Sequence, residues 1–484
     1  MTQEITNELL KENIKSFLNE LNNKLPPNIT VSTNWGDLFN VYKHYKNSQI
    51  FNRRLQFNPF IIVYCEQDSD VLTTYNTAKK NKLPIRVRAG GHDHEGECTG
   101  TNVVLIDVSK MKSVTIDSDT KIAHIGPGIR FESLTSILAK KDVMIPHGTC
   151  ATVGIAGFTM GGGWGPWTRK MGMCCEHLVG ADIILGDGTL KKLNVKDGNV
   201  PDLLWVLRGG GGMSYGIVTE LCIQTFELPP VLHRFDITWN SYEHENPDKL
   251  IEKVPTIKVL QKWEEIIKSV NTPNLTGTNL KINGRPWEKG KPVNMNTITH
   301  NCVFYGYWEG NKESLEYFIN TNFSDNLTPS EINIEKPTGS IHDDDYGKSL
   351  MSSWDRESLN KIKLRMSDDF TGIPLQPDED KPAPHKITSR LVNHNGLNAD
   401  NKNGYQKLLE SLSSDLILDG NRALGLFTYV TLRAIIGDFY NTRINETNSA
   451  FPYKEKLYTI QYQCWWNKKM NFKTTLFTIE QTTL

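Results

Sequence analysis

The chain has 484 residues, and its 54 Lys and Arg nearly balance its 55 Asp and Glu, for a formal net charge of −1. This balance argues against a protein that works mainly by coating nucleic acid or an anionic membrane. Apolar residues make up 38% and charged residues 23% of the chain, as in an ordinary folded protein long enough for more than one core. No apolar run approaches the roughly 20 residues that a membrane span needs.

The first expected element is an amphipathic helix near the N-terminus. Its apolar residues recur at helical spacing instead of forming the continuous apolar stretch of a secretory signal. The eight cysteines show no Cys-x-x-Cys spacing, which favours reduced thiols in a cytoplasmic protein without a metal centre. The apolar positions of the helix are Ile5, Leu9, Leu10, Ile14, Phe17, Leu18 and Leu21.

Residues 54–228 alternate short apolar runs with helical segments, which predicts an α+β region with mixed sheets. Residues 229–449 contain more Asn, Lys and Pro and predict a second domain. Within the first region we expect strands at 60–65, 84–88 and 102–108, helices at 69–81 and 131–141, and a hairpin whose strands at 182–185 and 190–193 flank Gly186-Asp187-Gly188.

Three glycine-rich segments stand out in the first half, at residues 88–96, 148–165 and 208–216. Glycine backbone approaches a ligand closely, and its N–H groups form concavities that hold phosphate oxygens. One such segment is usually a tight turn, but three in order favour a long phosphorylated cofactor. No Gly-Lys-Ser/Thr follows, so none is a Walker loop, and none has the strand–turn–helix context of a Rossmann fingerprint.

Two nucleophilic side chains, His92 and Cys150, are embedded in these glycine-rich segments. An imidazole nitrogen and a cysteine sulfur can both attack an electrophilic cofactor ring. Taken singly, a histidine in a turn is more often a hydrogen-bonding residue, and a lone cysteine more often fills a core.

The segments at 88–92, at 148–154 with the triple glycine 161–163, at 202–219 and at 450–462 resemble those of FAD-linked oxidases of the berberine bridge enzyme and gluco-oligosaccharide oxidase type, in the vanillyl-alcohol oxidase superfamily. This resemblance implies an α+β fold with a bilobed FAD-binding domain of the PCMH type and an antiparallel-sheet substrate domain backed by helices. The implied divisions are 1–53 (N-terminal helix and lead-in), 54–228 (FAD-binding domain), 229–449 (substrate domain) and 450–484 (a strand returning to the flavin domain, then an atypical short tail).

The resemblance also implies a covalently bound FAD, with His92 joined to the 8α-methyl of the flavin ring and Cys150 to its carbon 6. Gly216 and Val218 are expected near the adenine. No metal is expected. The other positions implied to contact the cofactor, chiefly around the pyrophosphate and ribityl chain, are Arg88, Ala89, Gly90, Gly91, Asp93, Gly148, Thr149, Gly154, Gly157, Gly161 and Gly163.

The implied reaction is hydride transfer from an alcohol carbon of a sugar or other natural product to FAD and then to oxygen, releasing hydrogen peroxide. Val153 matches the position that controls oxygen access, where Val is typical of oxidases and the bulkier Leu of dehydrogenases. His94, Trp164 and Gln461 match positions that line the substrate pocket. His94 is the best candidate base among these three, Trp164 suits stacking on a substrate ring, and Gln461 suits a hydrogen bond to the reacting hydroxyl.

The sequence departs from the family pattern after Trp466. Residues 467–484 contain neither the Tyr-x-Asn-Tyr loop that usually supplies the catalytic base nor the closing Arg-Tyr-Asp-Pro segment. The family also usually has Tyr where this chain has His94. Two alternatives to an oxidase therefore stay open: a dehydrogenase that uses another electron acceptor, and a catalytically impaired flavin-binding remnant. The expected partners are a small-molecule substrate and oxygen.

Overall fold

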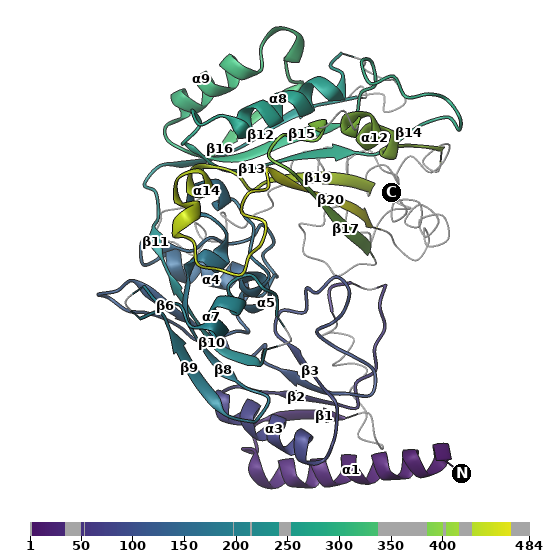
Figure 1. Cartoon of the computed structure of the whole chain (residues 1–484), viewed down its shortest axis with the longest axis vertical. Coiled ribbons are helices and arrows are strands. Elements are labelled where there is room, and N and C mark those ends of the chain that lie inside the picture. Colours follow the sequence, from purple (N-terminus) through teal and green to yellow (C-terminus); the bar gives the residue numbers. More distant parts are fainter. Residues whose placement is uncertain are drawn as a thin grey trace.

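The computed structural model describes residues 2–33, 50–52, 54–196, 198–212, 215–241, 253–336, 385–399, 403–415 and 428–465. Its main sheets are stacked along the long axis of the molecule (Figure 1). A four-stranded and a five-stranded sheet form the N-terminal lobe, and a seven-stranded sheet forms the other lobe. The predicted atypical tail lies outside the described residues.

The four-stranded sheet has the order β1-β2-β4-β3, with β2, β4 and β3 parallel and β1 antiparallel to β2. Helix α3 connects β2 to β3, and α1 packs on α3 along the lower edge of the molecule (Figure 1). Ile14, Phe17 and Leu21 of α1 are buried, as the predicted amphipathic helix requires, but Leu9, which is expected on the same apolar face, is 57% exposed. The elements are α1 (Thr2–Lys24), β1 (Thr30–Thr33), β2 (Ile61–Tyr64), α3 (Asp68–Lys80), β3 (Ile85–Arg88) and β4 (Val104–Asp107).

The five-stranded sheet is antiparallel and has the order β5-β6-β10-β8-β9. One face packs into a large apolar core together with α4, α5 and α7. The elements are β5 (Val114–Ile116), β6 (Ile122–Ile125), α4 (Phe131–Ala139), β7 (Val143–Met144), α5 (Ile155–Met160), α6 (Thr168–Met171), η1 (Cys174–His177), β8 (Leu178–Ile184), β9 (Leu190–Asn194), α7 (Asp202–Leu207), β10 (Ile217–Gln224) and β11 (Phe226–Glu227).

The seven-stranded sheet is antiparallel, with the order β16-β12-β15-β13-β19-β20-β17. Helices α8 and α9 cover one face, and part of the other face turns toward the N-terminal lobe (Figure 1). The elements are β12 (Leu232–Trp239), α8 (Thr256–Lys268), β13 (Leu275–Asn283), β14 (Arg285–Pro286), β15 (Cys302–Glu309), α9 (Lys312–Asn322), η2 (Asp325–Leu327), β16 (Glu331–Glu335), β17 (His385–Val392), α12 (Gly404–Ser411), β18 (Ser413–Ser414), β19 (Thr428–Ala434), α14 (Asp438–Arg443), η7 (Ile444–Glu446) and β20 (Tyr458–Trp465).

A buried arginine ties the two lobes together. Arg169 of α6 is 2% exposed. Its guanidinium donates to the carbonyl oxygens of Leu275, Ile267 and Ile436 and to Thr272 Oγ1, at 2.9–3.2 Å. A buried cation is tolerated when its donors are hydrogen-bonded, so this side chain fixes α6 on β13.

The α+β fold class predicted from the sequence is confirmed, as are the predicted strands and helices between residues 60 and 193. Each observed element lies within a few residues of its predicted range, except that β8 begins earlier, at Leu178. β8 and β9 pair antiparallel, as the Gly-Asp-Gly turn predicts. The division at 53/54, 228/229 and 449/450 stays a prediction.

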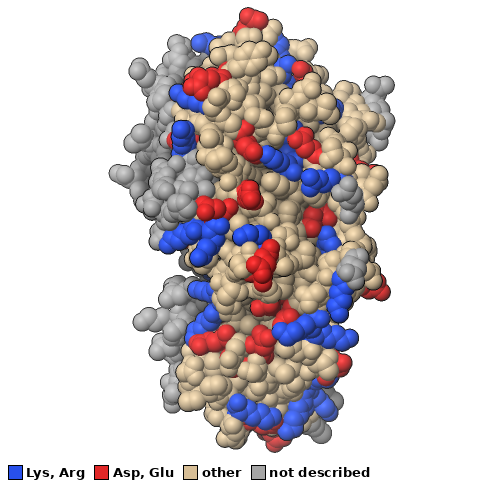
Figure 2. Space-filling model, turned by 90° about the vertical axis from the view of Figure 1, so that its left-hand side faces the viewer, with Lys and Arg blue, Asp and Glu red and all other residues tan. Residues whose placement is uncertain are grey.

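Charge is mixed over the surface in view in Figure 2, where Lys and Arg side chains are interspersed with Asp and Glu. This agrees with the near-zero net charge. Within the described part of the chain, no helix has the length and hydropathy to cross a membrane.

Candidate functional site

A cavity of about 910 Å³ lies between the two lobes. Its volume is at the upper end of the range for ligand sites. The lining runs from the turn after β8, at Leu185 and Gly186, past the first two glycine-rich segments to the face of β19 and β20. A cavity of this extent suits a long ligand that contacts several segments at once.

Two glycine-rich segments meet backbone to backbone at one wall of this cavity. A Cβ added to Gly90 would lie 2.5 Å from the Gly154 nitrogen, and a Cβ added to Gly154 would lie 2.8 Å from the Gly90 nitrogen. Real Cβ atoms do not approach other atoms so closely, so both positions require glycine for packing. Gly157 differs, because an added Cβ there would meet no atom within 4 Å. Its absent side chain therefore leaves open space at the cavity wall.

His92 lies in the cavity wall with its ring stacked on Phe51, at 4.0 Å between ring centroids and an interplanar angle of 22°. Its Nε2 is 2.6 Å from Thr152 Oγ1. Burial lowers the pKa of His92 to about 3, so the imidazole is neutral at pH 7 and keeps a nucleophilic lone pair.

Cys150 lies on the same segment as Thr152 and also lines the cavity. It is half-buried, whereas the other seven cysteines are buried, and none of the eight forms a disulfide. The Thr149 hydroxyl oxygen is 3.9 Å from its sulfur. The segment 149–152 thus brings His92 and Cys150 to the same part of the cavity.

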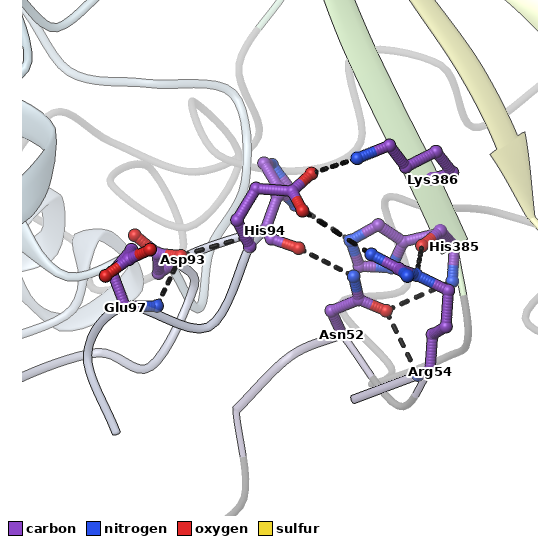
Figure 3. A network of polar contacts seen from close by, with 8 residues as sticks. Asn52, Arg54, Asp93, His94, Glu97, His385 and Lys386 are labelled. Carbon is purple, nitrogen blue, oxygen red and sulfur yellow. Dashed lines mark hydrogen bonds and ion pairs between the residues drawn. The ribbon is translucent and has the colours of Figure 1, made fainter. Parts of the chain in front are cut away.

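A second histidine of the glycine-rich segment, His94, pairs with a histidine from the other lobe (Figure 3). Nδ1 of His94 lies 2.8 Å from Nε2 of His385, the first residue of β17. The rings meet edge to face, and His385 is fully buried against Trp465. Burial, with a smaller contribution from Arg433, lowers the pKa of His94 to about 4. His94 is therefore a neutral hydrogen-bonding group at pH 7.

A polar network fixes this histidine pair (Figure 3). The side-chain amide of Asn52 donates to the backbone carbonyl of His94 at 2.6 Å, and its Oδ1 accepts from the backbone N–H of His385 at 3.2 Å. Glu95 binds Lys386 at 2.5 Å and Arg54 at 3.5 Å. These contacts join the loop after β3 to the start of β17 across the two lobes.

The opposite wall consists of polar side chains on adjacent strands of the seven-stranded sheet. Gln463 donates to Gln461 Oε1 at 3.0 Å and to Thr431 Oγ1 at 3.2 Å, and the Tyr429 hydroxyl donates to Gln463 Oε1 at 3.1 Å. The antiparallel register aligns Thr431 with Gln461 and Tyr429 with Gln463, so all four belong to one face. Lys281 lies under the Tyr429 ring, 4.2 Å from its centroid.

Trp164 closes one side of the pocket. Its indole nitrogen donates to the Ala434 carbonyl at 2.6 Å, and the Arg433 guanidinium lies 5.1 Å from the ring. The ring orientation is thus fixed by β19.

Of the residues predicted to form the site, Arg88 and Gly163 do not line the cavity. Arg88 is 2% exposed and binds Asp107 through Nε at 2.7 Å and Nη2 at 2.6 Å, which directs it into the N-terminal lobe. Gly163 has φ +86°, and a Cβ there would lie 2.6 Å from the Cys174 Cβ. The predicted residues that do line the cavity are Ala89, Gly90, Gly91, His92, Asp93, His94, Gly148, Thr149, Cys150, Val153, Gly154, Gly157, Gly161, Trp164, Gly216, Val218 and Gln461.

Sequence reasoning missed His385, which pairs with His94, and the cavity-lining residues Asn279, Tyr429, Arg433 and Gln463. Gln463 carries a detectable signal, because it follows Gln461 by two residues on a strand and so shares its face. The other four lie in segments without a motif.

Comparisons with known proteins agree with this geometry. Residues 59–194 match the FAD binding domain family. An uncharacterised FAD-linked oxidoreductase, YgaK of Bacillus subtilis, is 37% identical over 192 residues, which cover 39% of this chain and 42% of that protein. Berberine bridge enzyme-like 17 of Arabidopsis thaliana is 30% identical over 326 residues, which cover 64% of this chain and 57% of that protein. The chain thus spans about half the length of the curated relatives it matches.

The fold is shared with solved structures. The structure of Physcomitrella patens BBE-like 1 superposes with a TM-score of 0.70 at 21% identity, covering 96% of this chain and 87% of that one. This superposition confirms the expected fold, in which an FAD-binding lobe is joined to an antiparallel sheet backed by helices. The resemblance read from the glycine-rich segments is confirmed by the FAD binding domain match and by the FAD-linked relatives.

Proposed function

Because this chain contains an FAD-binding domain and its relatives are berberine bridge enzyme-like and FAD-linked oxidoreductases, we propose that it is an FAD-dependent oxidase. Its substrate is a sugar or related natural product that is oxidised at an alcohol carbon, and oxygen is the final electron acceptor. The observation that carries this proposal is the cavity itself. It combines two nucleophilic side chains on glycine-rich segments with a facing wall of amide and hydroxyl groups.

The residues present fit an FAD. The open space at Gly157 and the backbone approach of Gly90 to Gly154 form a wall that a cofactor can touch without meeting side chains. His92 and Cys150 are proposed as two covalent attachment points. Neutral His92 supports this role, as does the position of Cys150, the least buried of the cysteines, at the cavity.

When bound, FAD supplies a two-electron acceptor for the hydride that leaves the alcohol carbon. The chain must then accept the hydroxyl proton. We assign this role to Nε2 of His94, which has no hydrogen-bond partner among the described residues, in the tautomer whose Nδ1–H donates to Nε2 of His385. As the O–H bond breaks, its electron pair forms the carbonyl, and His385 stabilises the imidazolium through that hydrogen bond. Gln461 holds the substrate oxygen, and Trp164 offers a ring face to a sugar.

Acid precipitation of the purified protein tests the cofactor assignment. We expect a yellow pellet and flavin mass on peptides that contain His92 and Cys150. His92→Ala and Cys150→Ala should each leave one linkage, and the double variant should release all flavin to the supernatant. A colourless pellet from the wild type would overturn covalent attachment.

Oxygen consumption and peroxide release with a panel of sugars and alcohols test the reaction. We expect stoichiometric peroxide with at least one sugar. Flavin that stays oxidised under anaerobic incubation with the whole panel would contradict the proposed oxidase.

A further inference from the structure

A cluster on the outer face of the five-stranded sheet brings three different metal-binding side chains together, away from the cofactor cavity. His124 of β6 lies directly opposite Cys222 of β10 in the antiparallel register. Glu220 precedes Cys222 by two residues and so lies on the same face of β10. The neighbouring positions Ala123, Leu221 and Ile223 turn into the core on the opposite face. The strand pairing therefore places an imidazole, a carboxylate and a thiol side by side.

The three ligand atoms converge on one point. His124 Nδ1 lies 3.0 Å from Glu220 Oε1 and 3.4 Å from Cys222 Sγ, and Sγ lies 3.6 Å from the same Oε1. A tetrahedral zinc ion with Zn–N and Zn–O near 2.0 Å and Zn–S near 2.3 Å would set these N–O, N–S and O–S edges at roughly 3.3, 3.6 and 3.5 Å. The observed triangle matches these edges to within about 0.3 Å, so coordination needs only small adjustments of the side chains.

The contact pattern distinguishes this cluster from a nucleophilic triad. In a triad the nucleophile and the acid contact opposite nitrogens of the imidazole, so that a proton can pass through the ring. Here Glu220 and Cys222 both contact the same nitrogen, Nδ1. Three atoms around a common centre form a coordination site, not a proton relay.

We propose that His124, Glu220 and Cys222 bind a divalent cation of the zinc type, with solvent as the fourth ligand. A thiolate with an imidazole and a carboxylate selects such a cation over Mg²⁺ or Ca²⁺, which prefer oxygen ligands. Thiolate and carboxylate together balance its two positive charges. The side chains of His124 and Glu220 are 40% and 34% exposed, which leaves room for the solvent ligand and a route of entry.

Among the residues that the structure describes, this is the one group of three or more His, Cys, Asp or Glu side chains whose ligand atoms converge in this way. No metal-binding motif is visible in the sequence, because His124 and Glu220 are 96 residues apart and no Cys-x-x-Cys spacing occurs. The bound cation would cross-link β6 to β10. Val218, two residues before Glu220 on β10, lines the cofactor cavity, so the cross-link would make this part of β10 more rigid.

The test uses the full chain, treated with a chelator, reloaded with Zn²⁺ and passed over a desalting column. We expect the protein to retain one equivalent of zinc. Its zinc X-ray absorption spectrum, which bound flavin does not obscure, should show one sulfur and three nitrogen or oxygen neighbours. Zinc should also raise the thermal unfolding midpoint by a few degrees, because it binds only the folded chain.

Changes in the outer shell of a metal site already cost about 10–100-fold in affinity. Glu220→Gln and Cys222→Ser change the ligands themselves, so each should weaken zinc binding by about 100-fold or more and abolish the rise in midpoint. His394→Asn, an exposed histidine outside the cluster, is the matched control and should bind zinc as the wild type does. Glu220→Gln keeps the size and shape of a partly exposed side chain, so this variant should fold as the wild type does. Any loss of zinc binding then reports on the carboxylate ligand. A spectrum without sulfur, or unchanged binding by Cys222→Ser, would overturn the proposal.

Discussion

The contact between His94 and His385 predicts how substitution of each histidine changes the rate of flavin reduction. His94→Gln should slow anaerobic flavin reduction by substrate by about 10²–10⁴-fold, the usual contribution of a general base. His385→Gln should slow it by a smaller factor, about 10-fold, because the amide oxygen of glutamine is a weaker base than an imidazole nitrogen and stabilises the protonated His94 less. Stopped-flow absorbance of the flavin measures both rates.

The matched control is Lys386→Gln, which removes a contact to Glu95 in the same network without touching His94. If Lys386→Gln slows reduction as much as His385→Gln does, the imidazole pair has no special role. The wild-type rate should fall as pH drops through about 4, where His94 becomes protonated. Burial is the main cause of this low pKa, Arg433 lowers it further, and Asp93 and Glu95 raise it. His92 and His385 are the other titratable groups nearby.

Val153 gives a second prediction at this scale. It lines the cavity, and in the proposed oxidase a longer side chain there would narrow the route by which oxygen reaches the flavin. Val153→Leu should lower the rate of reoxidation by oxygen by at least about 10-fold. Reduction by substrate and reoxidation by an artificial dye acceptor should change little, and they serve as internal controls. An unchanged peroxide yield would rule out Val153 as the oxygen gate.

At the scale of elements, two glycines that look alike in sequence should behave oppositely when changed to alanine. Gly90→Ala should destabilise the protein by about 1–3 kcal/mol, because the new Cβ would overlap the backbone at Gly154. Gly157 lies within α5 with open space beside it, so Gly157→Ala should stabilise the flavin-free protein by about 0.5–1 kcal/mol. It should nevertheless lower flavin content, because the methyl group enters the cofactor space. Denaturant unfolding and flavin absorbance separate the two effects.

The sequence predicted the elements around the cavity well, because glycine segments and strand periodicity are local signals. It did not predict which way each side chain points. Arg88 belongs to a segment that resembles a cofactor loop, yet it turns away from the cavity to bind Asp107. His385 could not be found, because its partner His94 is 291 residues away and no motif surrounds it. Long-range pairing of this kind depends on the sheet order, which no local pattern encodes.

For the whole molecule, buried neutral histidines predict acid sensitivity. Burial lowers the pKa of His92 and His300 to about 3 and of His94 and His147 to about 4. In the unfolded chain these groups titrate near 6.5, so between about pH 6.5 and 4 the unfolded state binds more protons than the folded state. Stability should therefore fall as pH falls through this window, with each histidine contributing up to about 1.4 kcal/mol per pH unit.

Thermal or denaturant unfolding at pH 7.5, 6 and 5 measures this slope. His147→Asn offers a comparison, because it removes one titrating group outside the cofactor cavity and should flatten the pH dependence relative to the wild type. A stability that is constant from pH 7.5 to 5 would show that these imidazoles are not buried in neutral form.

The strand order of the seven-stranded sheet has a consequence for how the protein matures. β20 lies between β17 and β19, although it follows both in the sequence. During synthesis β17 therefore emerges before its described neighbour exists, and it can dock only when residues 458–465 have left the ribosome. Pairing of β17 with β20 then places Trp465 opposite His385. The segments that carry His92 and Cys150, the proposed attachment points, are synthesised earlier, but the wall formed by β19 and β20 is complete only after residues 458–465 have been made.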